Sequence, residues 1–435
     1  MKISTLAAAV ALMAGAHAGQ AADIEFWYGN TGNVETAIKA ECDAFNAAQK
    51  KHRVTCIGQG SYEVSMQKAI AAYRAHNHPV LIQFFDAGTL DLMLSDAVVP
   101  VQDILPDVKW DNYIAGARAY YETSDGRLYS QPYNASTLLF YTNKTELEKA
   151  GIAEPPTTWE EIIDAARKLK AAGHACPFVT DGDTWRVLEQ FSARHGLPIA
   201  SKHNGYDGLD AEYVFNTTFA AMHLANLVEW RKEGLVKLNA DTKAGNYTAA
   251  FNAGECAMME GSSGSYAASA KAFEGKYEIT VGMAPMYRGY ERHNTLVGGA
   301  SIYVMKGRDQ SEVEGAKAFL DFLRQPEQQM AFTAATGYVP VTNGVLDAIA
   351  RSGAASSPKY ATAAIGIGSM NQPRTEDSRG IRLGFYVQFR EVFMEETQKA
   401  FAGEQTMQAA LDRTKARGDE LLRRFEKTYK GAKLP

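Results

Sequence analysis

The sequence lacks the residue patterns that most catalytic and metal-binding proteins carry. Its nine histidines are scattered, with no H-E-x-x-H motif and no C-x-x-C pair, so no metal site is visible. No G-x-x-x-x-G-K-[ST] loop occurs, and the turn Gly261–Ser265 ends in serine where a G-x-S-x-G nucleophile elbow needs glycine. Asp181 and Asp183 share a loop, but calcium needs about six to eight oxygens. We therefore expect no enzyme activity, no metal and no cofactor.

Long apolar runs are missing beyond the N-terminus. Ile3–Gly15 is apolar, follows Lys2 and precedes Ala16, His17 and Ala18, which is the pattern of a secretory signal peptide over residues 1–18. Cleavage as late as Ala22 is also possible. The run is too short to span a bilayer, and no later stretch of about 18 apolar residues exists. No cysteine stands at the cleavage site, so we expect an exported, soluble protein that is not lipidated.

An excess of positive charge is also missing. Lysine and arginine number 45 against 50 acidic residues, and the formal net charge is −5. A nucleic acid or an anionic membrane would require a basic field, so neither is an expected partner. An anionic ligand would have to be held by local donors.

The chain has only four cysteines, which in an exported protein can form zero, one or two disulfides. The pairing that we favour is Cys42 with Cys56 and Cys176 with Cys256. Apolar packing alone also accounts for Cys42, because it shares one face of a predicted helix with Ile38.

Short apolar strands and amphipathic helices alternate along the chain. With 435 residues the chain exceeds one ordinary core, which favours two domains. The alternation indicates α/β domains with largely parallel sheets, in which ligands lie beyond the carboxyl ends of the strands. The predicted strands include 24–27, 54–57, 80–85, 138–141 and 301–305, and the predicted helices 34–50, 62–74, 159–172, 222–232, 312–324, 389–402 and 407–427.

The stretch 256–271 combines a buried strand, a turn and a helix start. The strand Cys256–Met259 is followed by a turn of glycine and serine, and a helix opens at Tyr266 with a serine placed to cap it. Free N–H groups, hydroxyls and the helix dipole together suit an anion. A capped turn that binds nothing accounts for the same residues.

Several blocks resemble a known family. The capping box Thr158–Glu161 after two prolines and the Gly-Tyr-x-Pro turn Gly337–Pro340 are similar to those of extracellular solute-binding proteins of ABC importers. Further blocks, in order over essentially the whole mature chain, resemble the glycerol-3-phosphate-binding members of that family. They are 131–141, 258–265, 298–305, 336–342, 379–384 and 421–427.

This resemblance implies a two-lobed fold that closes on its ligand like a hinged trap. Each lobe would be a mostly parallel sheet flanked by helices. Residues 23–132 with 300–340 would form lobe 1, and residues 133–299 with 341–435 would form lobe 2.

The resemblance also implies a function. A periplasmic, monomeric protein would capture sn-glycerol-3-phosphate or a glycerophosphodiester such as glycerophosphocholine. It would deliver this ligand to an inner-membrane ABC permease with a cytoplasmic ATPase. A sugar- or oligosaccharide-binding protein of the same fold is the alternative, and it would use more stacking aromatics and carboxylates. A secreted phosphodiesterase would need a metal or nucleophile that the sequence lacks, and an adhesive surface protein would show repeats.

Eight ligand-binding residues carry over from the family. They are Tyr62, Asp86, Ser136, Trp185, Ser262, Gly299, Tyr338 and Arg382. Ser262 would hold phosphate oxygens at the helix N-terminus, and Arg382 would donate two N–H groups to the phosphate. A structural ion pair also accounts for Arg382.

The remaining roles are hydroxyl donors, a close backbone approach and aromatic walls. Ser136 and Tyr338 would donate hydroxyls, and Gly299 would let its backbone N–H reach the ligand. Tyr62 and Trp185 would wall the cleft, although core positions would also suit them. Asp86 departs from the family, which has a glutamate there. Its carboxylate is one methylene shorter, so the sequence supports the phosphate end better than the glycerol end.

Overall fold

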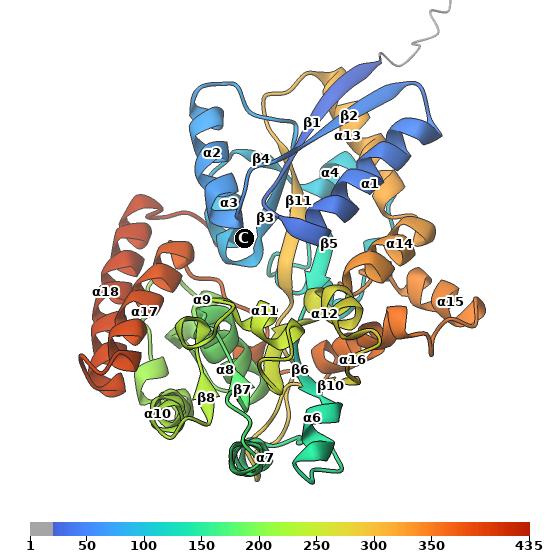
Figure 1. The fold of residues 1–435 in the computed structure, drawn as a ribbon. Coiled ribbons are helices and arrows are strands. Elements are labelled where there is room, and N and C mark those ends of the chain that lie inside the picture. The colour runs from blue at the N-terminus through green and yellow to red at the C-terminus, as the bar shows by residue number, and fades with distance from the viewer. Residues whose placement is uncertain (1–20) are drawn as a thin grey trace, which may run out of the picture.

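The computed structural model describes residues 21–435, and the predicted signal peptide, 1–18, lies outside the described residues. Two sheets, each flanked by helices, form a first lobe in blue and a second lobe in green and yellow (Figure 1). In the described part of the chain, no helix is both long enough and apolar enough to cross a membrane.

The sheet of the first lobe has the order β2-β1-β3-β11-β4, with β5 also paired to β11. β1 runs parallel to β2 and β3, since helices α1 and α2 carry the chain back between these strands. β11 returns from the second lobe and runs antiparallel to β3, β4 and β5. The strands are β1 (Ala22–Tyr28), β2 (His52–Gly58), β3 (Leu81–Phe85), β4 (Val98–Val99), β5 (Gln131–Ser136) and β11 (Gly298–Met305).

The sheet of the second lobe has the order β10-β6-β9-β7-β8. β6 is antiparallel to β9 and β10, whereas β7 is parallel to β8 and β9. Both sheets are therefore mixed, and the prediction of mostly parallel sheets was wrong. The antiparallel strands arise because the chain passes between the lobes, at β5–β6 and β10–β11, without a helix in the connection. The strands are β6 (Leu138–Asn143), β7 (Phe178–Val179), β8 (Val236–Lys237), β9 (Met258–Ser262) and β10 (Ile279–Met283).

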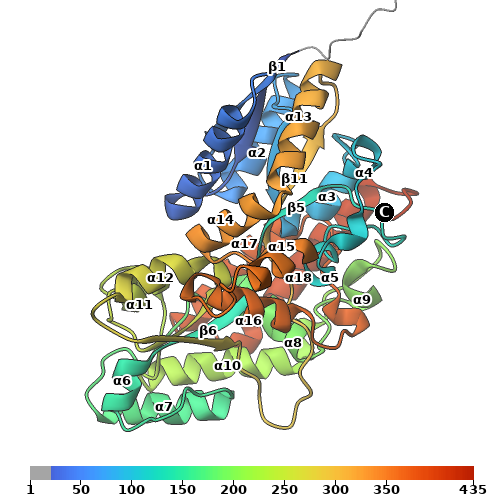
Figure 2. The ribbon, with the colours of Figure 1, turned by 90° about the vertical axis from the view of Figure 1, so that its right-hand side faces the viewer.

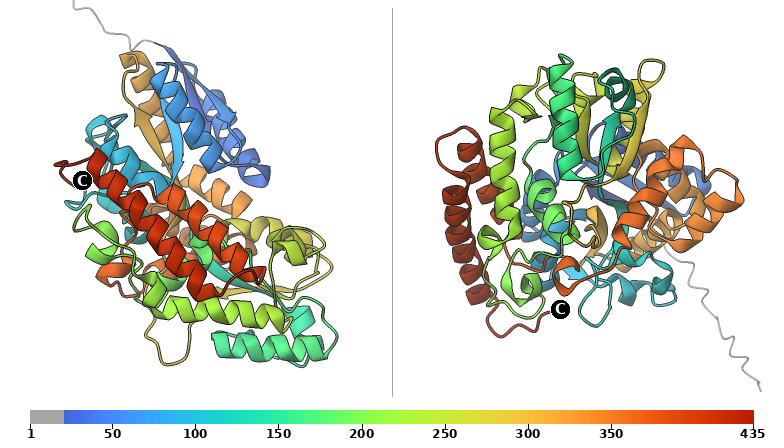
Figure 3. Two further views of the ribbon diagram at one scale, coloured as in Figure 1. Left: turned by 90° about the vertical axis from the view of Figure 1, so that its left-hand side faces the viewer. Right: turned by 90° about the horizontal axis from the view of Figure 1, so that it is seen from below.

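Long helices cover the sheets. In the first lobe these are α1 (Gly32–Ala48), α2 (Tyr62–Arg74) and α13 (Gln310–Leu323). In the second lobe α7 (Trp159–Ala171) and α10 (Phe219–Lys232) lie at the end far from α1 and α13 (Figure 2). The helices α17 (Tyr386–Phe401) and α18 (Met407–Thr428) pack side by side (Figure 3).

The shorter helices fill the connections. They are α3 (Thr89–Leu94), α4 (Val101–Ile104), α5 (Ala115–Arg118), α6 (Lys144–Lys149), α8 (Phe191–Arg194), α9 (Ser201–Gly205), α11 (Tyr247–Asn252), α12 (Tyr266–Phe273), α14 (Pro326–Thr336), α15 (Asn343–Arg351) and α16 (Ala361–Met370). In α9, Lys202, His203 and Asn204 have φ angles of 55°, 47° and 55°, so this segment is a left-handed turn.

Two local predictions are confirmed. The Thr158 hydroxyl accepts from the Glu161 N–H at 3.3 Å, and the Glu161 carboxylate accepts from the Thr158 N–H at 3.2 Å, which is the predicted capping box. The predicted order of strand, turn and helix over 256–271 is the second, although the strand β9 covers Met258–Ser262 instead of 256–259 and the turn is Ser263–Ser265. Within the described residues, the side chain of Ser265 at the start of α12 makes no capping hydrogen bond.

Both expected disulfides are present, Cys42–Cys56 and Cys176–Cys256. The first ties α1 to β2, and the second joins the residues that precede β7 and β9. Cys42 is also buried in the core, so it both packs against apolar residues and forms a disulfide.

A seam between the sheets positions the site. Only Thr137 separates β5 from β6. Ser136 pairs with Gly298, and Leu138 pairs with Ser262, so the ends of β5, β9 and β11 meet there. The residue boundaries of the two predicted lobes stay a prediction.

Candidate ligand-binding cavity between the lobes

A cavity of about 240 Å³ opens between the two lobes at this seam. Seven of the eight predicted ligand residues line it: Tyr62, Asp86, Ser136, Trp185, Ser262, Gly299 and Tyr338. Glu63, Phe85, Asp183, Arg186 and Arg390 complete the lining. The structure thus gathers residues that lie more than three hundred positions apart in the sequence, and Arg382 is absent from the lining.

Gly299 occupies a position that only glycine tolerates. Its φ is +88°, and an added Cβ would lie 2.0 Å from the carbonyl oxygen of Asn134. The pairing register also shifts between Gly299 and Ser301. Gly299 is therefore a kink at the start of β11 that packs against the Asn134 backbone, and the approach of its N–H to a ligand stays a prediction.

Ser262 stands at the end of β9, just before α12. Its Oγ accepts from the Gly264 N–H at 3.2 Å, and the Tyr141 hydroxyl donates to its carbonyl oxygen at 2.7 Å. These contacts fix the turn, while the Ser262 hydroxyl hydrogen stays available to the cavity.

Aromatic rings form two walls. Tyr62 stacks on Phe85 with ring centroids 5.3 Å apart and planes 9° apart. The indole of Trp185 lies against Gly298, where an added Cβ would come within 2.6 Å of the ring. The Trp185 Nε1 is buried without a hydrogen-bond partner among residues 21–435, so it is a donor that a ligand can satisfy.

Arg390 is the guanidinium that the sequence interpretation missed. It extends from α17, donates from Nη2 to Asp86 at 2.7 Å, and makes two 2.7 Å bonds to Glu189. Burial raises the pKa of Asp86, and Arg390 opposes this shift. Burial raises the pKa of Glu189 to about 7, again against Arg390. One guanidinium thus faces two carboxylates, Asp86 and Glu189.

Arg186 is a second buried guanidinium in the lining. It pairs with Asp181, donates to the Tyr247 hydroxyl at 2.7 Å, and stacks over the Tyr247 ring at 4.4 Å. Burial raises the pKa of the neighbouring Asp183, and Asp181 adds to the rise. Asp181 and Asp183, the two acids in this loop, therefore both interact with the charge of Arg186.

The structure corrects the assignment of Arg382. Its Nη2 donates to the carbonyl oxygens of Tyr120 and Glu122, at 3.3 and 2.7 Å, and its Nη1 contacts the sulfur of Met93. The flanking Gly384 is required because an added Cβ would lie 2.0 Å from the Phe425 ring. Arg382 therefore bridges main-chain carbonyls. Among residues 21–435 it makes no structural ion pair, which was the alternative.

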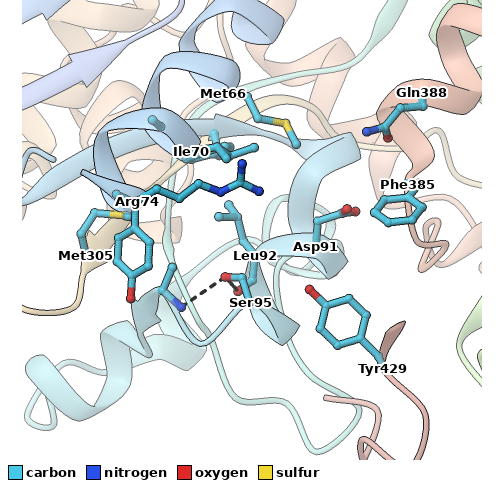
Figure 4. A pocket seen from close by; sticks show the side chains of 14 residues that line it. Met66, Ile70, Arg74, Asp91, Leu92, Ser95, Met305, Phe385, Gln388 and Tyr429 are labelled. Carbon is cyan, nitrogen blue, oxygen red and sulfur yellow. Dashed lines mark hydrogen bonds between the residues drawn. The ribbon is translucent and has the colours of Figure 1, made fainter. Parts of the chain in front are cut away.

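A larger cavity, of about 520 Å³, lies between α2, α3 and the start of α17 (Figure 4). Its walls are mostly apolar, with Met66, Leu92 and Phe385 among them, and Arg74 is exposed. One oxygen of Asp91 is buried without a partner in the described chain, and burial raises the Asp91 pKa to about 7. None of the predicted ligand residues lines this space, so the smaller cavity is the candidate site.

Comparison with known proteins decides the family. Residues 40–363 match the family model described as bacterial extracellular solute-binding protein. The chain is 37% identical to the sn-glycerol-3-phosphate-binding periplasmic protein UgpB of Escherichia coli O6:H1 (strain CFT073), and 36% identical to that of strain K12. Each alignment covers 98% of both chains. The chain belongs to the bacterial extracellular solute-binding protein family. It is accordingly a solute-binding protein of an ABC importer and not an enzyme.

Solved structures confirm the fold. UgpB from Mycobacterium tuberculosis in complex with glycerophosphocholine superposes with a TM-score of 0.75 at 20% identity, over 93% of this chain and 99% of that one. The sugar-binding protein MalE from Xanthomonas citri gives 0.73 at 17% identity, over 94% and 100%. The predicted two-lobed periplasmic binding protein fold is therefore confirmed, with mixed sheets.

Proposed function

We propose that the protein captures sn-glycerol-3-phosphate or a glycerophosphodiester in the interlobe cavity and delivers it to an ABC permease. The observation that carries this proposal is one small space in which the Arg390 guanidinium and the hydroxyls of Ser136, Ser262 and Tyr338 converge. Such donors suit a phosphate group, which has only acceptor oxygens. The name of the Escherichia coli relatives supports the same ligand.

The phosphate is assigned to the seam. Ser136, Ser262 and the Gly299 backbone would bind its oxygens, with Arg390 supplying the charge. Asp86 and Trp185 would take the glycerol end, Asp86 as acceptor and Trp185 through Nε1. Asp86 already accepts from Arg390, so a hydroxyl of the ligand would share this carboxylate.

The size of the cavity favours a small ligand. Its volume of about 240 Å³ is below the roughly 300–1,000 Å³ of pockets for drug-sized molecules. A glycerol phosphate is compatible with this space, whereas an oligosaccharide would require a more open cleft.

Delivery would proceed from the periplasm to an inner-membrane permease driven by a cytoplasmic ATPase. The protein would act as a monomer. With the predicted lobe boundaries, Tyr62 and Asp86 would belong to the first lobe, whereas Ser262 and Arg390 would belong to the second. A ligand that contacts both sets stabilises the closed arrangement, and binding thereby shifts an open–closed equilibrium.

Calorimetric titration tests the proposal. Protein that has been unfolded and refolded, to remove retained ligand, is titrated with glycerol-3-phosphate, glycerophosphocholine, inorganic phosphate and maltose. We expect saturable one-to-one binding of at least one glycerol phosphate and none of maltose. Binding of maltose alone would support the sugar-binding alternative, and binding of nothing in the panel would reject the ligand assignment.

A further inference from the structure

A buried glutamine sits at the centre of β3, behind the cavity. Gln83 is 1% exposed and contacts no lining hydroxyl directly. Its side chain accepts from the Gly29 N–H at 2.9 Å. It donates to the amide oxygens of Asn30 at 2.7 Å and Asn134 at 2.8 Å. The polar Gln83 is tolerated in the otherwise apolar strand β3 because both N–H donors of its amide have hydrogen-bond partners.

The Gly29 N–H determines the orientation of every amide in this network. A backbone N–H is a donor only, so the Gln83 atom beside it must be the oxygen. The Gln83 nitrogen then faces Asn30 and Asn134, and the atoms that meet it must be their oxygens. Both asparagines consequently present their NH₂ groups on the opposite side.

Both NH₂ groups point at one hydroxyl. Nδ2 of Asn134 lies 2.8 Å from the Tyr62 hydroxyl oxygen, and Nδ2 of Asn30 lies 3.1 Å from it. A phenolic oxygen accepts few hydrogen bonds, and these two occupy its acceptor capacity. The Tyr62 hydroxyl can therefore only donate.

The neighbouring Tyr338 hydroxyl does not reverse this result. Both tyrosines line the same cavity; burial raises the pKa of Tyr338, and a hydrogen bond from Tyr62 opposes this rise. If Tyr62 donates to Tyr338, then Tyr338 must direct its own proton into the cavity. If Tyr62 instead donates to the ligand, the Tyr62 proton itself makes the hydrogen bond to the ligand. The tyrosine pair offers a proton to the ligand in both arrangements.

We propose that Gln83 is a positioning residue that makes Tyr62 an obligate hydrogen-bond donor, and so selects ligands that place a proton-free acceptor oxygen there. Phosphate, phosphodiester and carboxylate oxygens are of this class, whereas a sugar hydroxyl in a donor role is not. The inference rests on the proposed ligand cavity and extends it to a residue outside the cavity lining.

Gln83→Glu reverses the network with little change in shape. A carboxylate at this position accepts from Gly29 and from both asparagine NH₂ groups, so the two amides turn over. Their oxygens then face Tyr62, whose proton is drawn away from the ligand. The new charge would also repel an anion, so a single variant does not separate the two effects.

A double-mutant cycle separates them. In the wild type, Tyr62→Phe should weaken glycerol-3-phosphate binding about tenfold or more, as expected for a hydrogen bond to a charged group. In the Gln83→Glu background the same substitution should change affinity less than about threefold, because the donor is already lost. Ser136→Ala is the matched control, since its hydroxyl makes no bond to the amides, and its effect should be equal in both backgrounds. An equal effect of Tyr62→Phe in both backgrounds would overturn the proposal.

Neutron diffraction tests the network without any ligand. Deuterated crystals of the wild-type protein should show the deuterium atoms of Asn30 and Asn134 directed at the Tyr62 oxygen. Amide oxygens facing Tyr62 would overturn the proposal whichever ligand the protein binds. If instead the wild type binds no glycerol phosphate, the proposed function fails, and the cycle is repeated with inorganic phosphate.

Discussion

Asp86 and Arg390 form an ion pair of 2.7 Å in the cavity lining, between the residue that follows β3 and helix α17. Glu189 pairs with the same guanidinium. Under the proposed function the contact between Asp86 and Arg390 would link ligand charge to closure, because an anion competes with Asp86 for the same donors.

The two arginines near the C-terminus should respond differently to the same substitution. Arg390→Lys keeps a charge but loses the planar fork, and we expect glycerol-3-phosphate affinity to fall at least about tenfold. Arg382→Lys is the matched control, because Arg382 lies outside the cavity lining. It should change affinity less than about threefold while lowering the unfolding free energy by about 1–3 kcal/mol through the Tyr120 and Glu122 carbonyls. Calorimetry and urea unfolding check both, and the opposite ranking of affinities would contradict the assignment.

Ligand affinity should decrease as pH rises from 7 to 9. Over this range the phosphate is a dianion, since phosphate monoesters have a second pKa of about 6. A dianion beside Asp86 and Glu189 raises their pKa values further, so binding takes up protons and weakens as protons become scarce. Calorimetry in buffers with different ionisation heats measures this uptake. Glu189→Gln should reduce it, and proton release by the wild type would contradict the expected linkage.

The disulfides should contribute to stability in the order of the loops that they close. Cys176–Cys256 spans 80 residues and Cys42–Cys56 spans 14. Replacing Cys176 and Cys256 by serine should lower the unfolding free energy by about 4 kcal/mol. Replacing Cys42 and Cys56 by serine should lower it by about 3 kcal/mol. Chemical denaturation of the two double variants measures this, and a larger loss from the shorter loop would be inconsistent with the loop-entropy account.

Glu41 should make the protein less stable at alkaline pH. It is buried in α1 and accepts from the Tyr133 hydroxyl, and burial raises its pKa to about 8. The unfolded state ionises Glu41 near pH 4.3, so stability is lost as pH rises from about 4 to about 8. Glu41→Gln should therefore raise the unfolding free energy by about 2–4 kcal/mol at pH 8.5, and much less at pH 4.5. The exposed Glu154→Gln is the control, and an equal gain at both pH values would exclude this cause.

The alternation of strands and helices predicted α/β domains, and the resemblance to solute-binding proteins predicted the two lobes. The prediction of mostly parallel sheets was wrong. Local patterns depend on neighbours in sequence. The capping box at Thr158 is confirmed, whereas the turn before α12 begins at Ser263, because β9 continues past Met259 to Ser262. The antiparallel return of β11 was not predictable, because a strand carries no sequence mark of its direction.

The site was harder to predict where two similar residues competed. Arg382 and Arg390 are eight positions apart, and Arg382 is flanked by Gly380 and Gly384. Those glycines allow close packing against Phe425 and Tyr206. Glu189 and Gln83 also went unnoticed, because their importance comes from partners about 50 to 200 residues away.

The most direct measurement of the central claim is a crystal structure of refolded protein with sn-glycerol-3-thiophosphate. The sulfur of this ligand gives an anomalous peak that marks the phosphate position. The account expects that peak in the interlobe cavity, within hydrogen-bonding reach of the Ser262 hydroxyl or the Arg390 guanidinium. A peak outside this cavity, or a bound ligand whose phosphate contacts neither residue, would contradict it.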